Sequence, residues 1–232
     1  MALPTITIDD FTGWAKIALN EFKQVSLEEY IATFQEEYLR KIVGDWAYYL
    51  IASENLQKWV DLIQGVSYSA DGKTIYMPGL KKSLVYFIYF EYTRDNFTSR
   101  VTGKAKGKSE LSERATDIEV GQIAVSRYNK AVRLINNSLP DFLDYYEKVT
   151  TTITNSNSSG GGNYNLTVDT NTYLYAGDTV TIEGIEYGVI SVSGSGNIVI
   201  DGGATGLDFT GLQAYWKPFE SVNFELLRFC TI

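Results

Sequence analysis

A basic, glycine-containing segment carries the residues best placed to bind a ligand. Residues 103–109 read Gly-Lys-Ala-Lys-Gly-Lys-Ser, which is close to the phosphate-binding loop of nucleotide-binding proteins. That loop has four residues between its glycines, whereas this segment has three. It also requires a preceding strand and a following helix, so that backbone amides surround the phosphate. The pattern here predicts a helix before the segment, which argues against a nucleotide site.

The same segment could act through charge alone. Arg100, Lys104, Lys106 and Lys108 place four positive charges close together in a chain whose formal net charge is −8. Such a segment suits sequence-independent contacts with DNA phosphates, which gain affinity from counterion release. It would equally suit a solvated loop tip, or pairing with acidic patches on a neighbouring copy. The sequence leaves these alternatives open.

The remaining residue types give little support to catalysis. Histidine is absent, which excludes Ser–His–Asp and Cys–His sites and any zinc site that contains histidine. The single cysteine, Cys230, excludes an internal disulfide. The carboxylate pairs at 9–10, 28–29 and 36–37 are sequence neighbours, which point about 100° apart on a helix instead of facing each other across a cleft. We therefore expect no enzymatic activity, no cofactor and no metal site.

Composition predicts a folded protein without a membrane segment. The chain has 232 residues, of which 44% are hydrophobic, so it can bury a core. The apolar run from Leu84 to Phe90 is too short to span a bilayer, and the N-terminus lacks the pattern of a signal peptide.

Residues 1–150 are predicted to form a mainly helical domain with one short β-hairpin. The chain should begin with an extended arm over 1–10 and a first helix over 10–23. A capping-box motif at 26–29 should open an amphipathic helix that ends at Gly44. Periodicity predicts further helical stretches from Asp45, from Leu56 to Gly65, and over 80–98, 110–137 and 141–149, with a break at Pro140. Asp71-Gly72 between alternating runs predicts a hairpin over 66–77.

Beyond Thr150 the composition shifts from helical to β patterns. Residues 151–162, rich in Thr, Ser, Asn and Gly, resemble a flexible linker. Strands are predicted over 164–168, 179–183, 186–192 and 197–200, so that 163–216 would form a small all-β barrel or sandwich. Residues 217–232 form an aromatic tail that should return to pack on the helical domain or on a neighbour. The predicted fold class is therefore α+β.

Several aromatic side chains are candidates for packing or binding surfaces. Tyr86 and Tyr89 help to make the predicted helix from Leu80 apolar nearly all round, so a neighbouring subunit or the rest of its own bundle must cover it. Four aromatic residues of the tail region are further candidates for subunit packing. They are Trp216, Phe219, Phe224 and Phe229. Tyr173, Tyr175 and Tyr187 in the β region are candidate stacking platforms for a glycan.

Two segments resemble a family of viral structural proteins. Residues 33–50, Thr-Phe-Gln-Glu-Glu-Tyr-Leu-Arg-Lys-Ile-Val-Gly-Asp-Trp-Ala-Tyr-Tyr-Leu, look like the first block of the small helical head–tail connector (adaptor) proteins of tailed bacteriophages, including those of crAss-like phages. Residues 80–96, Leu-Lys-Lys-Ser-Leu-Val-Tyr-Phe-Ile-Tyr-Phe-Glu-Tyr-Thr-Arg-Asp-Asn, resemble a second block. The usual adaptor lacks a counterpart of residues 151–216.

The resemblance implies a virion protein that acts through assembly. Its helical domain would be a connector-type bundle that forms a ring, usually a dodecamer, beneath the portal protein and beside other tail and connector proteins. The genomic double-stranded DNA would pass through the ring during ejection, where the basic segment could contact it. The protein would be assembled in the host bacterial cytoplasm and reside at the head–tail interface. The alternative is a glycan- or receptor-binding module of a phage tail.

Overall fold

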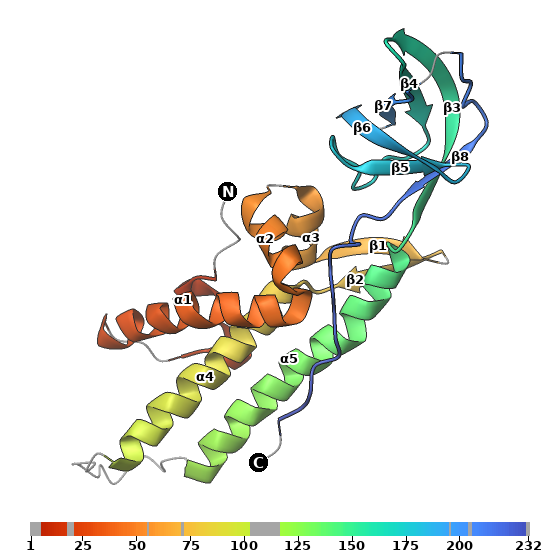
Figure 1. Cartoon of the computed structure of the whole chain (residues 1–232). Coiled ribbons are helices and arrows are strands. Elements are labelled where there is room, and N and C mark those ends of the chain that lie inside the picture. Colours follow the sequence, from red (N-terminus) through yellow and green to blue (C-terminus); the bar gives the residue numbers. More distant parts are fainter. Residues whose placement is uncertain are drawn as a thin grey trace. The chain divides into compact units, whose positions relative to one another are not determined.

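The computed structural model describes residues 6–17, 21–54, 56–70, 72–102, 117–194, 196–203 and 206–230. Its contacts divide the chain into two compact units. The helical unit comprises Met1–Phe142 and Ser221–Ile232, and the barrel unit comprises Leu143–Glu220. The chain is thus a mixed α and β protein, and Figure 1 labels its elements.

The N-terminal region differs from the helix predicted over 10–23. It forms two short 3₁₀ turns, Ile8–Asp10 and Gly13–Ala15, before α1 begins. The backbone N–H of Thr7 donates to Asp10 Oδ2 at 2.8 Å, which closes the first turn locally. Gly13 has a φ of +57°, a left-handed conformation that interrupts a right-handed helix. The helix predicted over 10–23 is therefore wrong over residues 10–17, whereas residues 21–23 belong to α1.

Helix α1 spans Glu21–Val43 and runs straight through the motif at 26–29 that was predicted to open it. Leu27, inside the motif, and Ile42, near the end of the helix, are fully buried, so packing sustains the helix within and beyond the motif. Gly44, with a φ of +85°, ends α1 as predicted, because a positive φ costs glycine less than any residue with a Cβ. Two short helices follow, α2 over Asp45–Ser53 and α3 over Gln57–Gln64, and both confirm the sequence pattern.

The predicted hairpin is confirmed. Strands β1 (Val66–Ala70) and β2 (Lys73–Met77) pair antiparallel, with Tyr68 opposite Ile75. Tyr68 is 6% exposed and meets the Phe142 ring edge-on, at 5.7 Å between centroids. The hairpin therefore contributes to the core of the helical unit.

Two long helices form the rest of the helical unit (Figure 1). Helix α4 spans Leu80–Thr102, and α5 spans Asp117–Tyr145. Asp117 is the first described residue of α5. The helix start predicted at residue 110 lies outside the described residues. The break predicted at Pro140 is wrong, because α5 continues through it. Leu139 and Phe142 are fully buried on either side of Pro140, so core packing outweighs the hydrogen bond that proline removes.

The barrel unit is a closed six-stranded antiparallel barrel with the strand order β3-β4-β7-β6-β5-β8. The strands are β3 (Val149–Gly160), β4 (Asn163–Val168), β5 (Thr179–Ile182), β6 (Ile185–Ser193), β7 (Asn197–Asp201) and β8 (Gln213–Trp216). The four predicted strands correspond to β4, β5, β6 and β7. Tyr164, Val180, Ile200 and Ala214 are among the residues that fill its core.

The linker predicted over 151–162 is wrong, because β3 occupies nearly all of it. Thr151 and Ile153 are 4% and 0% exposed and point into the barrel, while the far end of β3 pairs with β4 in a polar hairpin. β-branched residues favour extended backbone, and closure of the barrel supplies partners on both sides of β3. The β unit therefore begins earlier than 163.

Within the described ranges, no helix is both long and apolar enough to cross a membrane.

Candidate functional site

The predicted basic segment lies between α4 and α5 in the chain. Arg100 belongs to the last part of α4, and its side chain lies outside the described part of the structure. Lys104, Lys106 and Lys108 lie outside the described residues altogether. The prediction for this segment therefore remains a prediction.

Helix α4 is covered largely by its own chain. Tyr86 is 6% exposed, and Lys130 Nζ of α5 lies 5.5 Å from its ring centroid. Tyr128 of α5 packs against Phe87 and Phe90, each at 5.0 Å between centroids. Tyr89 is half-buried. Of the two alternatives for covering this helix, packing within the bundle accounts for most of the buried surface.

A buried polar network joins α1 to α4. The Tyr38 hydroxyl donates to Glu91 Oε1, and Arg94 pairs with Glu91 Oε2 at 2.6 Å. The Tyr38 ring also stacks on Phe87 at 4.5 Å. Burial, with the hydrogen bond to Glu91, raises the pKa of Tyr38 well above its usual value. The network keeps a buried carboxylate paired, which is a structural role.

Trp216 and Phe219 pack within the barrel unit. Trp216 is 3% exposed, and its Nε1–H donates to the Thr172 carbonyl oxygen at 3.0 Å. Phe219 is 5% exposed and lies edge-on to Tyr146 and Tyr173. Both side chains are thus enclosed by their own chain.

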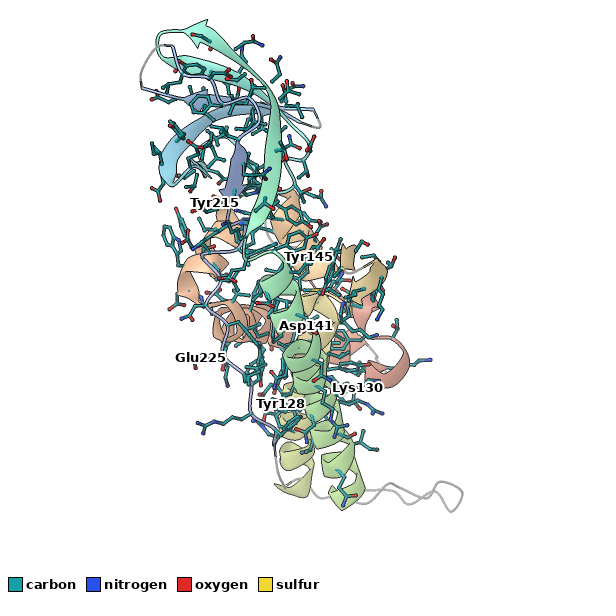
Figure 2. All side chains as sticks on the ribbon, turned by 90° about the vertical axis from the view of Figure 1, so that its right-hand side faces the viewer. Tyr128, Lys130, Asp141, Tyr145, Tyr215 and Glu225 are labelled. Atoms are coloured by element: carbon teal, nitrogen blue, oxygen red, sulfur yellow. The ribbon has the colours of Figure 1, made fainter. Side chains whose placement is uncertain are left out.

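Residues 221–230, called the tail segment below, run along the helical unit without forming a helix or strand. Figure 2 labels Glu225 of this segment, with Tyr128 and Lys130 of α5. The Asn223 backbone N–H donates to the Val43 carbonyl at the end of α1, at 3.1 Å. Phe224 is half-buried, whereas Phe229 is 54% exposed.

Two asparagines of α5 hold the tail segment by its main chain. Asn136 Oδ1 accepts from the Leu227 N–H at 3.0 Å, and Asn136 Nδ2 donates to the Leu227 carbonyl at 2.9 Å. Asn129 repeats the pattern with Cys230, at 2.8 and 2.9 Å. Each side-chain amide therefore satisfies both main-chain groups of one tail residue, and we call this pair the asparagine clamp.

The spacing of the asparagine clamp matches an extended chain. Asn129 and Asn136 are seven residues apart, which is about 10.5 Å along a helix and returns to nearly the same face. Leu227 and Cys230 are three residues apart, which is about 10 Å along extended backbone. Sequence reasoning missed both asparagines. Their signal was an Asn pair at heptad spacing on a predicted helix, which is a weak pattern without knowledge of the partner.

The barrel unit carries an open hollow of about 380 Å³. Its lining includes Asp178, Glu186, Tyr215, Lys217 and Glu220. Lys148 Nζ lies 3.7 Å from the centroid of the Tyr215 ring, so a cation already covers one face of that ring. Charged groups and hydroxyls at such a hollow could hydrogen-bond a polar ligand.

The predicted stacking tyrosines do not gather at this hollow. Tyr173 packs against Tyr146 and Phe219, and Tyr187 packs edge-on against Phe209 of the barrel core. Tyr175 is half-buried, and its backbone N–H donates to Asp178 Oδ2 at 2.9 Å. Among the described residues, no group of three or more cysteine or carboxylate side chains could hold a metal ion.

Comparison of the chain with protein-family models and with curated proteins finds no match.

Proposed function

We propose that this protein is a structural virion subunit that forms part of a connector ring between the head and the tail of a tailed bacteriophage. It acts through self-association and docking, without catalysis. The resemblance carried by residues 33–50 and 80–96 supports the proposal. Those two segments pack against each other in one unit, with Tyr38 stacked on Phe87.

The observation that carries the proposal is an exposed aromatic surface on the helical unit. Trp46 and Tyr49 of α2 are 63% and 58% exposed and stack on each other at 5.6 Å. Tyr76 of the hairpin, a separate position, is 64% exposed. Large aromatic side chains are enriched at protein–protein interfaces, and grouped exposure of this kind is unfavourable in an isolated subunit.

The finer features of the proposal follow from the resemblance. The ring is a dodecamer that stacks on the portal protein and on other tail or connector proteins, and it surrounds the channel for double-stranded DNA. Assembly takes place in the host bacterial cytoplasm, and the mature protein resides in the virion.

Light scattering with negative-stain imaging tests the ring. The purified chain is examined at high concentration, alone and with the portal protein. We expect closed rings, or recruitment onto the portal. The double substitution Trp46→Ser with Tyr49→Ser should reduce assembly, whereas Ile185→Ser, at a 58% exposed position in the barrel unit, should leave it unchanged. A chain that stays monomeric under every condition and ignores the portal contradicts the proposal.

A measurement of DNA binding at several salt concentrations tests the role of the basic segment separately. Replacing Arg100, Lys104, Lys106 and Lys108 by serine should weaken DNA binding and flatten its dependence on salt, because each lost phosphate contact reduces counterion release. A wild-type protein that shows no salt-sensitive DNA binding contradicts this role and leaves the ring proposal untouched.

A second candidate function is glycan or receptor binding, which the hollow beside Tyr215 favours. Tyr215→Ala in the full-length chain should abolish binding to host surface polysaccharide, and Tyr76→Ala serves as the matched control on the other unit. Binding that survives Tyr215→Ala, or no binding at all, contradicts the hollow as a glycan site.

A further inference from the structure

The asparagine clamp recognises the main chain of the tail segment, while much of the tail's apolar side-chain surface stays exposed. Leu226 and Phe229 are 69% and 54% exposed. Arg133 Cζ lies 5.9 Å from the Phe229 ring centroid, at the edge of cation–π range. Four hydrogen bonds of the clamp join the tail segment to α5. A segment without helix or strand that is held by main-chain hydrogen bonds, with Leu226 and Phe229 exposed, can leave and rebind as a unit.

The surface of the helical unit that binds the tail segment nevertheless matches this particular segment. The tail passes close to the α1–α2 junction, where the position of a Cβ on Gly44 would lie 3.4 Å from the Asn223 Cβ, at van der Waals contact. The Val43 carbonyl receives the Asn223 N–H at that point. The junction and the asparagine clamp together specify an extended chain of fixed length and direction, and every copy of the protein carries that chain.

We propose that the asparagine clamp of one copy accepts the tail segment of a second copy, so that neighbouring subunits exchange tails. The inference rests on the proposed function, since a ring brings the clamp of one subunit beside the tail of the next. Exchange re-forms the same hydrogen bonds between chains, which makes it a low-cost route to association. The exposed Leu226 and Phe229 side chains then gain contacts with the neighbour.

The native Cys230 provides a direct test, because its backbone is bound by Asn129. Two differently tagged full-length chains are co-expressed. The donor chain keeps Cys230 as its only thiol. The acceptor chain carries Cys230→Ser and Ser126→Cys, a position exposed on α5 one turn before Asn129. A short bismaleimide crosslinker then joins the two chains only where the tail of the donor lies on α5 of the acceptor.

We expect a covalent product that contains both tags. The additional substitutions Asn129→Ala and Asn136→Ala in the acceptor should reduce its yield at least about tenfold, as expected for the loss of the four clamp hydrogen bonds. An acceptor with Glu29→Cys in place of Ser126→Cys measures random collisions, because Glu29 is exposed on α1. A single chain with both Ser126→Cys and Cys230 reports the tail bound to its own α5.

The outcomes separate this proposal from the ring. Rings in which only the single chain crosslinks to itself overturn tail exchange and leave the ring proposal standing. Crosslinks between chains, with neither closed rings nor recruitment onto the portal, support exchange and contradict the ring. Equal yields from the Ser126→Cys and Glu29→Cys acceptors overturn exchange, because the contact would then be random.

Discussion

At the scale of single residues, the raised pKa values of Tyr38 and Tyr30 make the stability of the helical unit depend on pH in the alkaline range. Burial and the hydrogen bond to Glu91 raise the pKa of Tyr38, and burial with the bond to Asp95 raises the pKa of Tyr30 to about 12. Unfolded tyrosines lose their proton near pH 10.0, whereas these two keep it in the folded state. Their contribution to stability is therefore fully present below that pH and is lost as the pH rises through the folded pKa values.

This predicts a fall in the free energy of unfolding at alkaline pH that depends on Tyr38. Tyr38→Phe should lower stability near neutral pH by about 1–3 kcal/mol, because Glu91 loses a buried donor. It should also make the alkaline fall shallower than in the wild type. Urea unfolding from neutral pH to about pH 11 measures both effects. Parallel pH profiles for the two proteins would refute the assignment, and Tyr76→Phe is the exposed control.

At the scale of elements, β3 shows how a polar, glycine-rich sequence becomes a strand. Ile153→Ala should destabilise the barrel unit by about 2–5 kcal/mol, because it empties a fully buried position. Ser158→Ala, on the exposed end of the same strand, should change stability by no more than about 0.5 kcal/mol. Thermal unfolding measures both variants. A neutral Ile153→Ala would instead favour a linker.

Helix α5 offers the opposite test, since it contains a proline that the core overrides. Pro140→Ala should stabilise the helical unit by about 1–2 kcal/mol, because it restores a helical hydrogen bond at some entropic cost in the unfolded state. The melting temperature and the urea midpoint measure the change. A lower stability would mean that the ring of Pro140 contributes more by packing than it costs in hydrogen bonding.

At the scale of the whole molecule, the chain has two separate cores. Phe87 is fully buried in the helical unit, and Ile200 is fully buried in the barrel unit. We expect two calorimetric transitions, since each unit can unfold cooperatively. Phe87→Ala should lower one transition and Ile200→Ala the other, each with a cost of about 2–5 kcal/mol. A single transition that both substitutions shift equally would contradict independent units.

The sequence by itself determined the features that depend on neighbouring residues. Gly44 and Gly65 end helices, Gly72 lies in the turn of a hairpin, and alternating residues form four barrel strands, because backbone conformation and periodicity are local properties. The N-terminal helix and the break at Pro140 were predicted wrongly because the prediction used local patterns alone. In each case a contact outside the local window, or a single left-handed residue, outweighed the local preference.

Only the tertiary structure decided which surfaces are covered and which remain exposed. Strand β8 pairs with β3 and β5, which both lie far from it along the chain, and a local pattern does not contain information about such distant partners. Trp216 and Phe219, predicted for subunit packing, lie enclosed within the barrel unit, while Trp46 and Tyr49 remain exposed. The asparagine clamp joins residues about ninety or more positions apart. Such contacts arise from the folding of distant segments onto one another, which the spacing of residues within one segment does not encode.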